Sequence, residues 1–132
     1  MLETAAEFMR LRTSKDPEEY WRAATEEAAV STWIDVIERY PDMRFWVAQN
    51  KTVPVEILAR LAMDDDPKVR SMVARKRKLG SRLLEQMASD PNDAVRLAVA
   101  RHRNTPPDVL ARLAQQDTWV EVRNVAGERL RA

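Results

Sequence analysis

Apolar residues recur at positions i, i+3 and i+4 in successive segments of the chain, a spacing that places them on one stripe of a helix. The clearest triplets are Leu58, Leu61 and Ala62, then Leu84, Met87 and Ala88, then Leu110, Leu113 and Ala114. They follow one another at intervals of 26 residues. A less regular copy comes earlier and has Trp33, Val36 and Ile37. The chain is therefore expected to contain a repeated helix.

A second apolar pattern follows each triplet and predicts a second helix in every repeat. Its segments cover residues 43–48, 69–74, 95–100 and 122–127. Each begins with Met or Val and ends on Ala or Gly, so a large side chain anchors the start and a small one allows a neighbouring helix to approach. We expect four repeats of two helices each, at about residues 29–54, 55–80, 81–106 and 107–132.

The first 28 residues do not follow the repeat but carry helix signals of their own. Asp16 followed by Pro17 is typical of a helix start, because the Asp side chain caps free N–H groups and Pro fits the first turn. We expect a helix from Pro17 to about residue 29, with a short amphipathic helix before it, and both should cover the end of the stack as an N-terminal cap. Trp21, Trp33 and Trp119 lie on apolar stripes and are expected in the core.

An acidic residue lies six positions before an arginine in each repeat. The pairs are Glu38 with Arg44, Asp64 with Arg70, Asp90 with Arg96, and Asp117 with Arg123. This spacing is kept although the repeats differ by one residue in length elsewhere, which indicates a structural requirement. We expect these residues to form a structural ladder in which each arginine binds the acid six residues before it.

A two-helix unit with an acid between its helices and an arginine early in the second helix resembles HEAT repeats. The short period, and the Asn or Thr-Pro elements in residues 48–54 and 100–106, make the chain similar to the leucine-rich-repeat-variant relatives of that superfamily. The resemblance implies an all-α fold, a right-handed α-solenoid of about four two-helix repeats forming a single domain over residues 1–132. In such stacks the acids and arginines form ladders between units, and the second helices line the concave face.

Composition excludes several classes of protein. The 132 residues are 45% hydrophobic and 33% charged, which is typical of a folded domain and not of a disordered chain. There is no cysteine, so disulfides and thiolate chemistry are excluded and a reducing compartment is expected. No apolar run approaches membrane-spanning length and no secretory signal is evident, so the expected location is the cytoplasm.

Residues suited to catalysis or metal binding are scarce. His102 is the single histidine, and its position at the end of a second helix fits interaction with the helix dipole better than acid-base catalysis. Asp64, Asp65 and Asp66 lack the glycine-containing loop of a calcium site and are expected to cap helices or pair with arginine. We therefore expect a protein that is not an enzyme and has no catalytic residue, metal or cofactor.

The second helices offer the candidate binding surface. Net charge is only +1, from 22 basic and 21 acidic residues, so any basic patch must be local. Residues 75–78 and residues 101–103 carry basic runs at matching positions, and stacking of the repeats predicts that they form one basic strip. By helical period, Phe45 and Leu97 should point outward; a helix rotated by one position would expose Trp46 and Met72 instead. The expected partner-binding residues are Phe45, Gln49, Arg75, Lys76, Leu97 and Arg101.

Two functions fit this surface. The first is protein–protein interaction by a monomer, of the adaptor or toxin-neutralising type that the resemblance to bacterial HEAT-like proteins implies. The alternative is nucleic-acid binding through the basic strip, distantly like HEAT-like DNA glycosylases, although no residue matches the pocket of those enzymes. A purely structural role of the strip also remains open, because basic side chains at helix C-termini satisfy the helix dipole. Membrane binding is not expected, and the irregular repeats disfavour a designed protein without a partner.

Overall fold

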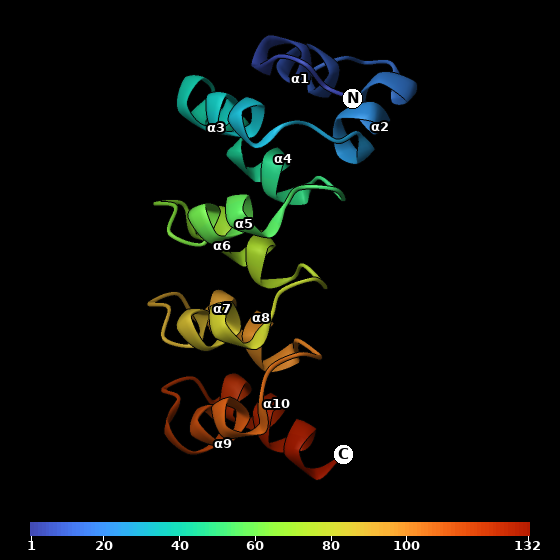
Figure 1. Ribbon diagram of the computed structural model, residues 1–132. Coiled ribbons are helices and arrows are strands. Elements are labelled where there is room, and N and C mark those ends of the chain that lie inside the picture. The colour runs from blue at the N-terminus through green and yellow to red at the C-terminus, as the bar shows by residue number, and fades with distance from the viewer. The chain divides into compact units, whose positions relative to one another are not determined.

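The computed structural model describes all 132 residues, and its regular elements are ten α-helices and one short 3₁₀ helix. Figure 1 follows them from α1 in blue to α10 in red. In chain order they are α1 (Ala5–Arg12), α2 (Pro17–Thr25), α3 (Val30–Arg39), η1 (Pro41–Met43), α4 (Arg44–Gln49), α5 (Val55–Leu61), α6 (Pro67–Ala74), α7 (Ser81–Met87), α8 (Asp93–Arg101), α9 (Pro107–Gln116) and α10 (Val120–Arg131). The predicted all-α fold of helical repeats is confirmed.

The chain divides into two compact units. Unit 1 covers Met1–Asp64 and contains α1 to α5, and unit 2 covers Asp65–Ala132 and contains α6 to α10. The two units are described separately below. A single domain over residues 1–132 and a right-handed solenoid remain predictions from the sequence.

Helix starts in unit 1 follow the capping signals of the sequence. The Asp16 carboxylate accepts the Glu18 N–H at 3.0 Å, and Pro17 occupies the first turn of α2. However, α2 ends at Thr25, earlier than predicted. The reason is that Leu2 forms a parallel bridge with Ala28 and donates its N–H to the Glu27 carbonyl at 2.8 Å, which holds that segment extended.

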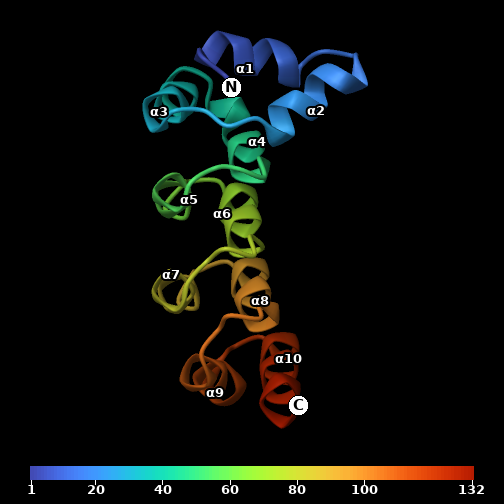
Figure 2. The same ribbon diagram turned by 45° about the vertical axis from the view of Figure 1, so that its right-hand side comes forward.

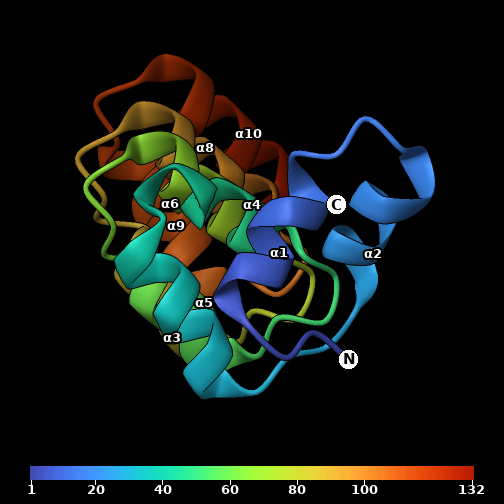
Figure 3. The ribbon, with the colours of Figure 1, turned by 90° about the horizontal axis from the view of Figure 1, so that it is seen from above.

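The N-terminal helices pack against the first repeat. Helix α1 contacts both α2 and α3, and α2 contacts α4; Figure 3 shows α1 between α2 and α3. The rings of Phe8 and Trp33 meet edge to face with centroids 5.3 Å apart, and both side chains are fully buried. Trp33 therefore lies in the core, as predicted. Trp21 does not, because it is 57% exposed on α2 with the Lys51 ammonium 4.5 Å above its ring.

Unit 2 stacks its helices in two rows. Figure 2 shows α7 and α9 on one side and α8 and α10 on the other. Helix α8 packs against α7 within its repeat and against α6 and α10 along the row of second helices. The apolar stripes meet between the rows, where the buried side chains are Leu84, Met87, Val95, Val99, Leu110, Leu113, Val122 and Ala126. The row of second helices is the scaffold for the surfaces described next.

Candidate functional site

Three of the four repeated arginines bind the acid of the following repeat. In unit 2 the Arg70 Nε lies 2.8 Å from Asp90 Oδ2, and the Arg96 Nε lies 2.8 Å from Asp117 Oδ2. Each arginine also reaches the second carboxylate oxygen through Nη2, so both pairs are bidentate. In unit 1 the Arg44 Nη1 lies 3.3 Å from Asp64 Oδ1. These ion pairs connect neighbouring repeats.

The acid six residues before each arginine contributes in a different way. Arg96 Nη1 donates to the backbone carbonyl of Asp90 at 2.9 Å, and Arg123 Nη1 donates to that of Asp117 at 2.7 Å. The prediction that Asp90 and Asp117 bind these arginines through their side chains is therefore wrong. Their carboxylates accept the backbone N–H two residues onward, from Asn92 and Trp119, and this turn directs them to the arginine of the preceding repeat.

The ion pairs of unit 2 are largely shielded from water. The side chains of Arg96 and Asp117 are 11% and 3% exposed. The hydrogen bond that Arg96 donates to the Asp117 carboxylate raises the pKa of Arg96 above its ordinary value, and a further bond that it donates to Asp93 acts in the same direction, whereas burial opposes both. Removing one partner of such a pair would leave a poorly solvated charge without compensation.

Two members of the predicted ladder stand outside it. The Glu38 side chain is 61% exposed and lies 3.3 Å from Arg60, while Arg44 Nε donates to the carbonyl of Ile37 at 2.9 Å. Glu38 is therefore a surface ion-pair residue, and the predicted pairing with Arg44 is wrong. Arg123 is half-buried and has the carbonyl of Asp117 as its hydrogen-bond partner, with no carboxylate in contact.

A second set of hydrogen bonds lies at the C-terminal ends of helices. Each bond joins a residue at or near the end of one helix to a backbone carbonyl at or near the end of a neighbouring helix. Asn50 Nδ2 donates to the Ala23 carbonyl at 2.8 Å, and Arg129 Nη1 donates to the Ala100 carbonyl at 2.7 Å. His102 Nε2 lies 2.7 Å from the Lys76 carbonyl. Sequence reasoning missed this set because Asn, His and Arg share a nitrogen donor but no obvious residue pattern.

His102 holds two loops together, in agreement with a structural role. Its Nδ1 accepts the Asn104 N–H at 3.0 Å, so Nε2 carries the proton and donates to the Lys76 carbonyl. Asn104 extends the contact through bonds to the carbonyls of Arg77 and Leu79, at 3.1 and 3.0 Å. These bonds hold residues 75–78 beside residues 101–103, as the basic strip requires.

The side chains of the basic strip differ in how far they are exposed to solvent. Arg75, Arg77, Lys78, Arg101 and Arg103 are exposed, whereas Lys76 is half-buried and His102 is buried. Lys76 contributes its backbone carbonyl to the contact with His102.

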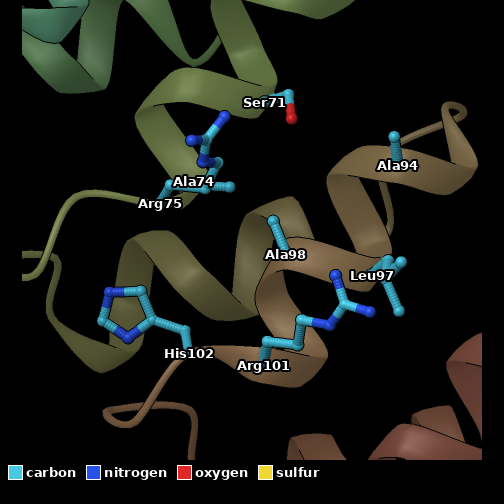
Figure 4. Close-up of a pocket in the computed structure, with 8 residues that line it drawn as sticks. All are labelled: Ser71, Ala74, Arg75, Ala94, Leu97, Ala98, Arg101 and His102. Atoms are coloured by element: carbon cyan, nitrogen blue, oxygen red, sulfur yellow. The ribbon is translucent and has the colours of Figure 1, made fainter.

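A groove of about 500 Å³ lies between α6 and α8. It is lined by Ser71, Ala74, Arg75, Ala94, Leu97, Ala98, Arg101 and His102. Figure 4 shows Ala98 between Arg75 on the α6 side and Arg101 on the α8 side. The structure thus brings together Arg75, Leu97 and Arg101 from the predicted site. Two arginines flank a floor of small apolar side chains.

Leu97 and Phe45 differ from the expectation that both are exposed. Leu97 is 9% exposed, because α8 lies between α6 and α10 and its side chain forms part of the groove wall. Phe45 is half-buried in unit 1, where its ring meets that of Trp46 edge to face at 4.9 Å. Gln49 is half-buried on the same helix. The predicted site is therefore split between a groove in unit 2 and a separate set on α4.

The ring of Trp46 also contacts an arginine. The Arg12 guanidinium carbon lies 3.5 Å from its centroid, and the same group lies 5.9 Å from the ring centroid of Tyr20. Trp46 and Met72 are half-buried. This stacked cluster joins α1, α2 and α4 and contributes to the packing of unit 1.

One comparison with known proteins identifies a segment of unit 2. The matching family model is the leucine rich repeat variant, over residues 93–117. The predicted resemblance is confirmed there. The leucine rich repeat variant segment runs from α8 through α9 to the next acid, so it contains both Arg96 and its partner Asp117. No curated protein and no solved structure matches the chain.

The leucine rich repeat variant is a HEAT-like structural repeat module. No group of three or more His, Cys, Asp or Glu side chains is placed to hold a metal ion. None of the helices has both the length and the apolar character needed to cross a membrane. The groove and the basic strip both lie at the row of second helices in unit 2.

Proposed function

We propose that this chain is a non-enzymatic module that binds another protein, in an adaptor or toxin-neutralising role, through the groove between α6 and α8. One observation carries this proposal: Arg75, at the end of α6, lines the same groove as Leu97 and Arg101 of α8. Both walls are helices tied together by the His102 contact, so the groove exists before a partner arrives. A preformed surface lowers the entropic cost of binding.

The groove favours a partner segment with an acidic side chain next to a small apolar one. Arg75 and Arg101 supply guanidinium groups that bind carboxylates, and Ala74, Ala98 and Leu97 supply apolar contact. Arg101 lies 3.6 Å from Glu121 in the free protein, with both side chains exposed. Because an exposed ion pair contributes little stability, a carboxylate of the partner can replace Glu121 at small cost.

Nucleic-acid binding is the second candidate, and it makes a different demand on the same region. Arg77 and Arg103 are exposed within the basic strip but do not line the groove. A phosphate backbone would contact arginines along the whole strip, whereas a peptide in the groove needs only Arg75 and Arg101. The two candidates therefore differ in which arginines matter.

The test is an affinity purification from the native host with two charge-reversal variants beside the wild type. Arg75→Glu with Arg101→Glu changes the groove, and Arg77→Glu with Arg103→Glu makes the same change of net charge outside it. We expect a protein partner that survives nuclease treatment, is lost from the groove variant and is retained by the strip variant. Circular dichroism of both variants checks that they are folded.

Two outcomes would contradict the proposal. Recovery of only nuclease-sensitive material, with equal loss from both variants, would establish nucleic-acid binding by the strip. A steep fall of affinity with salt concentration would point the same way, because phosphate contacts release counterions. Retention of the partner by the groove variant would place the binding site elsewhere on the chain.

A further inference from the structure

The groove between α6 and α8 has two guanidinium groups and no carboxylate in its lining. Arg75 directly follows α6 and Arg101 is the last residue of α8, so the two charges come from neighbouring repeats. The Ser71 hydroxyl lies one turn before Arg75 on the same wall, as Figure 4 shows. Both ring nitrogens of His102 are already hydrogen-bonded to the backbone. The groove therefore offers a ligand two cations and one hydroxyl group.

Elsewhere in unit 2 a single arginine is enough to bind a carboxylate. The Arg70 guanidinium forms a bidentate pair with Asp90, and Arg96 forms one with Asp117. A carboxylate has two oxygens and one charge, so one guanidinium group satisfies it. A ligand that engages both arginines of the groove at once needs a larger charge and more acceptor oxygens.

A carboxylate of the chain already lies at one end of this arginine pair. Arg101 Nη2 is 3.6 Å from Glu121 Oε1 with both side chains exposed, whereas Arg75 belongs to none of the ion pairs of unit 2. A partner carboxylate that displaces Glu121 exchanges one exposed ion pair for another, which changes the free energy of binding little. A dianion that also reaches Arg75 gains a second charge-assisted contact. Glu121 therefore favours a dianion over a single carboxylate.

We propose that the groove binds a phosphorylated serine or threonine side chain of the partner protein, with Arg75 and Arg101 on the phosphate. This inference rests on the proposed function and specifies the chemistry by which the partner is recognised. A phosphomonoester has about two negative charges at neutral pH and three strong acceptor oxygens, so it matches two guanidinium groups and the Ser71 hydroxyl. The small side chains of Ala74 and Ala98 leave room for a tetrahedral group between the arginines.

The backbone of a nucleic acid is a different kind of phosphate ligand. Its phosphodiesters have one charge each and follow one another along the strand, so they favour a row of cations over a single pair. Arg77 and Arg103 extend such a row outside the groove. The arginine pair of the groove therefore fits a phosphomonoester better than a nucleic-acid backbone.

The experiment measures binding of a synthetic peptide to the full chain by fluorescence anisotropy. The labelled peptide consists of alanine and leucine around one central phosphoserine, and two further peptides have glutamate or serine in its place. We expect saturable binding of the phosphoserine peptide, about tenfold weaker binding of the glutamate peptide, and no measurable binding of the serine peptide. Arg75→Gln and Arg101→Gln should each weaken binding of the phosphoserine peptide about tenfold.

Glu121→Gln separates recognition of the phosphate from a general attraction of anions. It removes the carboxylate that competes for Arg101, so it should tighten binding of the glutamate peptide more than that of the phosphoserine peptide. The matched controls for the groove variants are Arg77→Gln and Arg103→Gln, which each remove one exposed cation outside the groove. They should leave the preference for phosphoserine unchanged, and circular dichroism checks that every variant is folded.

Three outcomes would overturn the inference. Absence of binding between the folded wild type and the phosphoserine peptide would exclude a phosphate site in the groove. Equal affinity for the glutamate and phosphoserine peptides, with both lost in Arg75→Gln, would leave the proposed function standing with a carboxylate as the recognised group. Displacement of the peptide by a single-stranded oligonucleotide, whose own binding Arg77→Gln weakens as much as Arg75→Gln does, would identify a nucleic-acid site. Failure of the proposed function is recognised separately, because the affinity purification would then recover no partner that depends on Arg75 and Arg101.

Discussion

Arg96 binds the carboxylate of Asp117, 21 residues later in the chain, and touches Asp90, six residues earlier, only through its backbone carbonyl. One side chain therefore joins the turn of its own repeat to the turn of the next. The pair is shielded from water, so removing one partner leaves a charge without compensation in a poorly solvated place. The loss of unfolding free energy is therefore expected for the pair of Arg96 with Asp117 and can be measured.

The first prediction concerns the coupling between Arg96 and Asp117. Arg96→Ala and Asp117→Ala should each lower the free energy of unfolding by about 2–4 kcal/mol, and the double variant should lose much less than the total of the two. A double-mutant cycle by chemical denaturation measures the coupling. The matched cycle with Asp90→Ala and Arg96→Ala should show weak coupling, because these side chains do not pair. Stronger coupling in the second cycle would contradict the observed arrangement.

The second prediction compares two acids at equivalent positions. Asp64 is bound by Arg44 and its side chain is 8% exposed, whereas Glu38 is 61% exposed. Glu38→Ala should change the free energy of unfolding by less than about 1 kcal/mol, because surface ion pairs contribute little. Asp64→Ala should cost more than Glu38→Ala under the same denaturation conditions. Equal costs would mean that exposure does not decide the contribution of this position.

The third prediction concerns His102. Replacing it with Ala removes the acceptor of the Asn104 N–H and the donor to the Lys76 carbonyl, so we expect a loss of about 1–3 kcal/mol in the free energy of unfolding. His102→Asn should be milder, because Asn50 donates from the equivalent position in unit 1. Thermal melting of both variants tests this order. Identical melting temperatures for wild type and His102→Ala would exclude a stabilising role.

The fourth prediction is a dependence on acid pH. A hydrogen bond from Arg22 lowers the pKa of Glu26 below its ordinary value, while burial opposes it and the Met1 amino group assists. A carboxyl whose pKa is lower in the folded state stabilises the fold above its unfolded pKa, and this contribution is lost as the pH falls through the folded pKa. The melting temperature of the wild type should therefore fall more steeply below the ordinary carboxyl pKa than that of Glu26→Gln. Parallel curves for the two proteins would contradict the shift.

The helices and their buried faces could be predicted from the sequence because they depend on local periodicity. Triplets such as Leu84, Met87 and Ala88 recur with the helical spacing, and all three side chains are buried. Capping signals such as Asp16 with Pro17 are equally local, and they marked the start of α2 correctly. The end of α2 depends on pairing of Leu2 with Ala28, which no local signal reveals.

The pairing of the ladder could not be predicted from the spacing, because the repeat hides it, whereas the resemblance to HEAT repeats implied contacts between units and these are present. With a period of 26 residues, the acid six positions before an arginine and the acid 20 positions after it occupy equivalent places. Spacing alone cannot tell a contact within a repeat from one between repeats. The decision comes from the turn that directs the Asp90 carboxylate toward Arg70.

Helical periodicity predicted which residues line the groove, but it did not predict how far each side chain is exposed. The helical period placed Arg75, Leu97 and Arg101 on one column, and all three line the groove. The exposed fraction of each side chain depends on how closely neighbouring helices approach, and this buried Leu97. Trp21 failed in the opposite sense, because its ring is exposed on α2 and is contacted by the Lys51 ammonium.

The bonds at both ends of α8 have a consequence for how unit 2 comes apart. At its first turn, Arg96 is bound to Asp117, and at its last turn the Ala100 and His102 carbonyls are bound by Arg129. Loosening α9 and α10 would thus break contacts at two distant points of α8 at once. Strong coupling between nearest neighbours makes a repeat array behave cooperatively. Amide hydrogens of α8 and α10 should therefore exchange with solvent through one shared opening event, and not helix by helix.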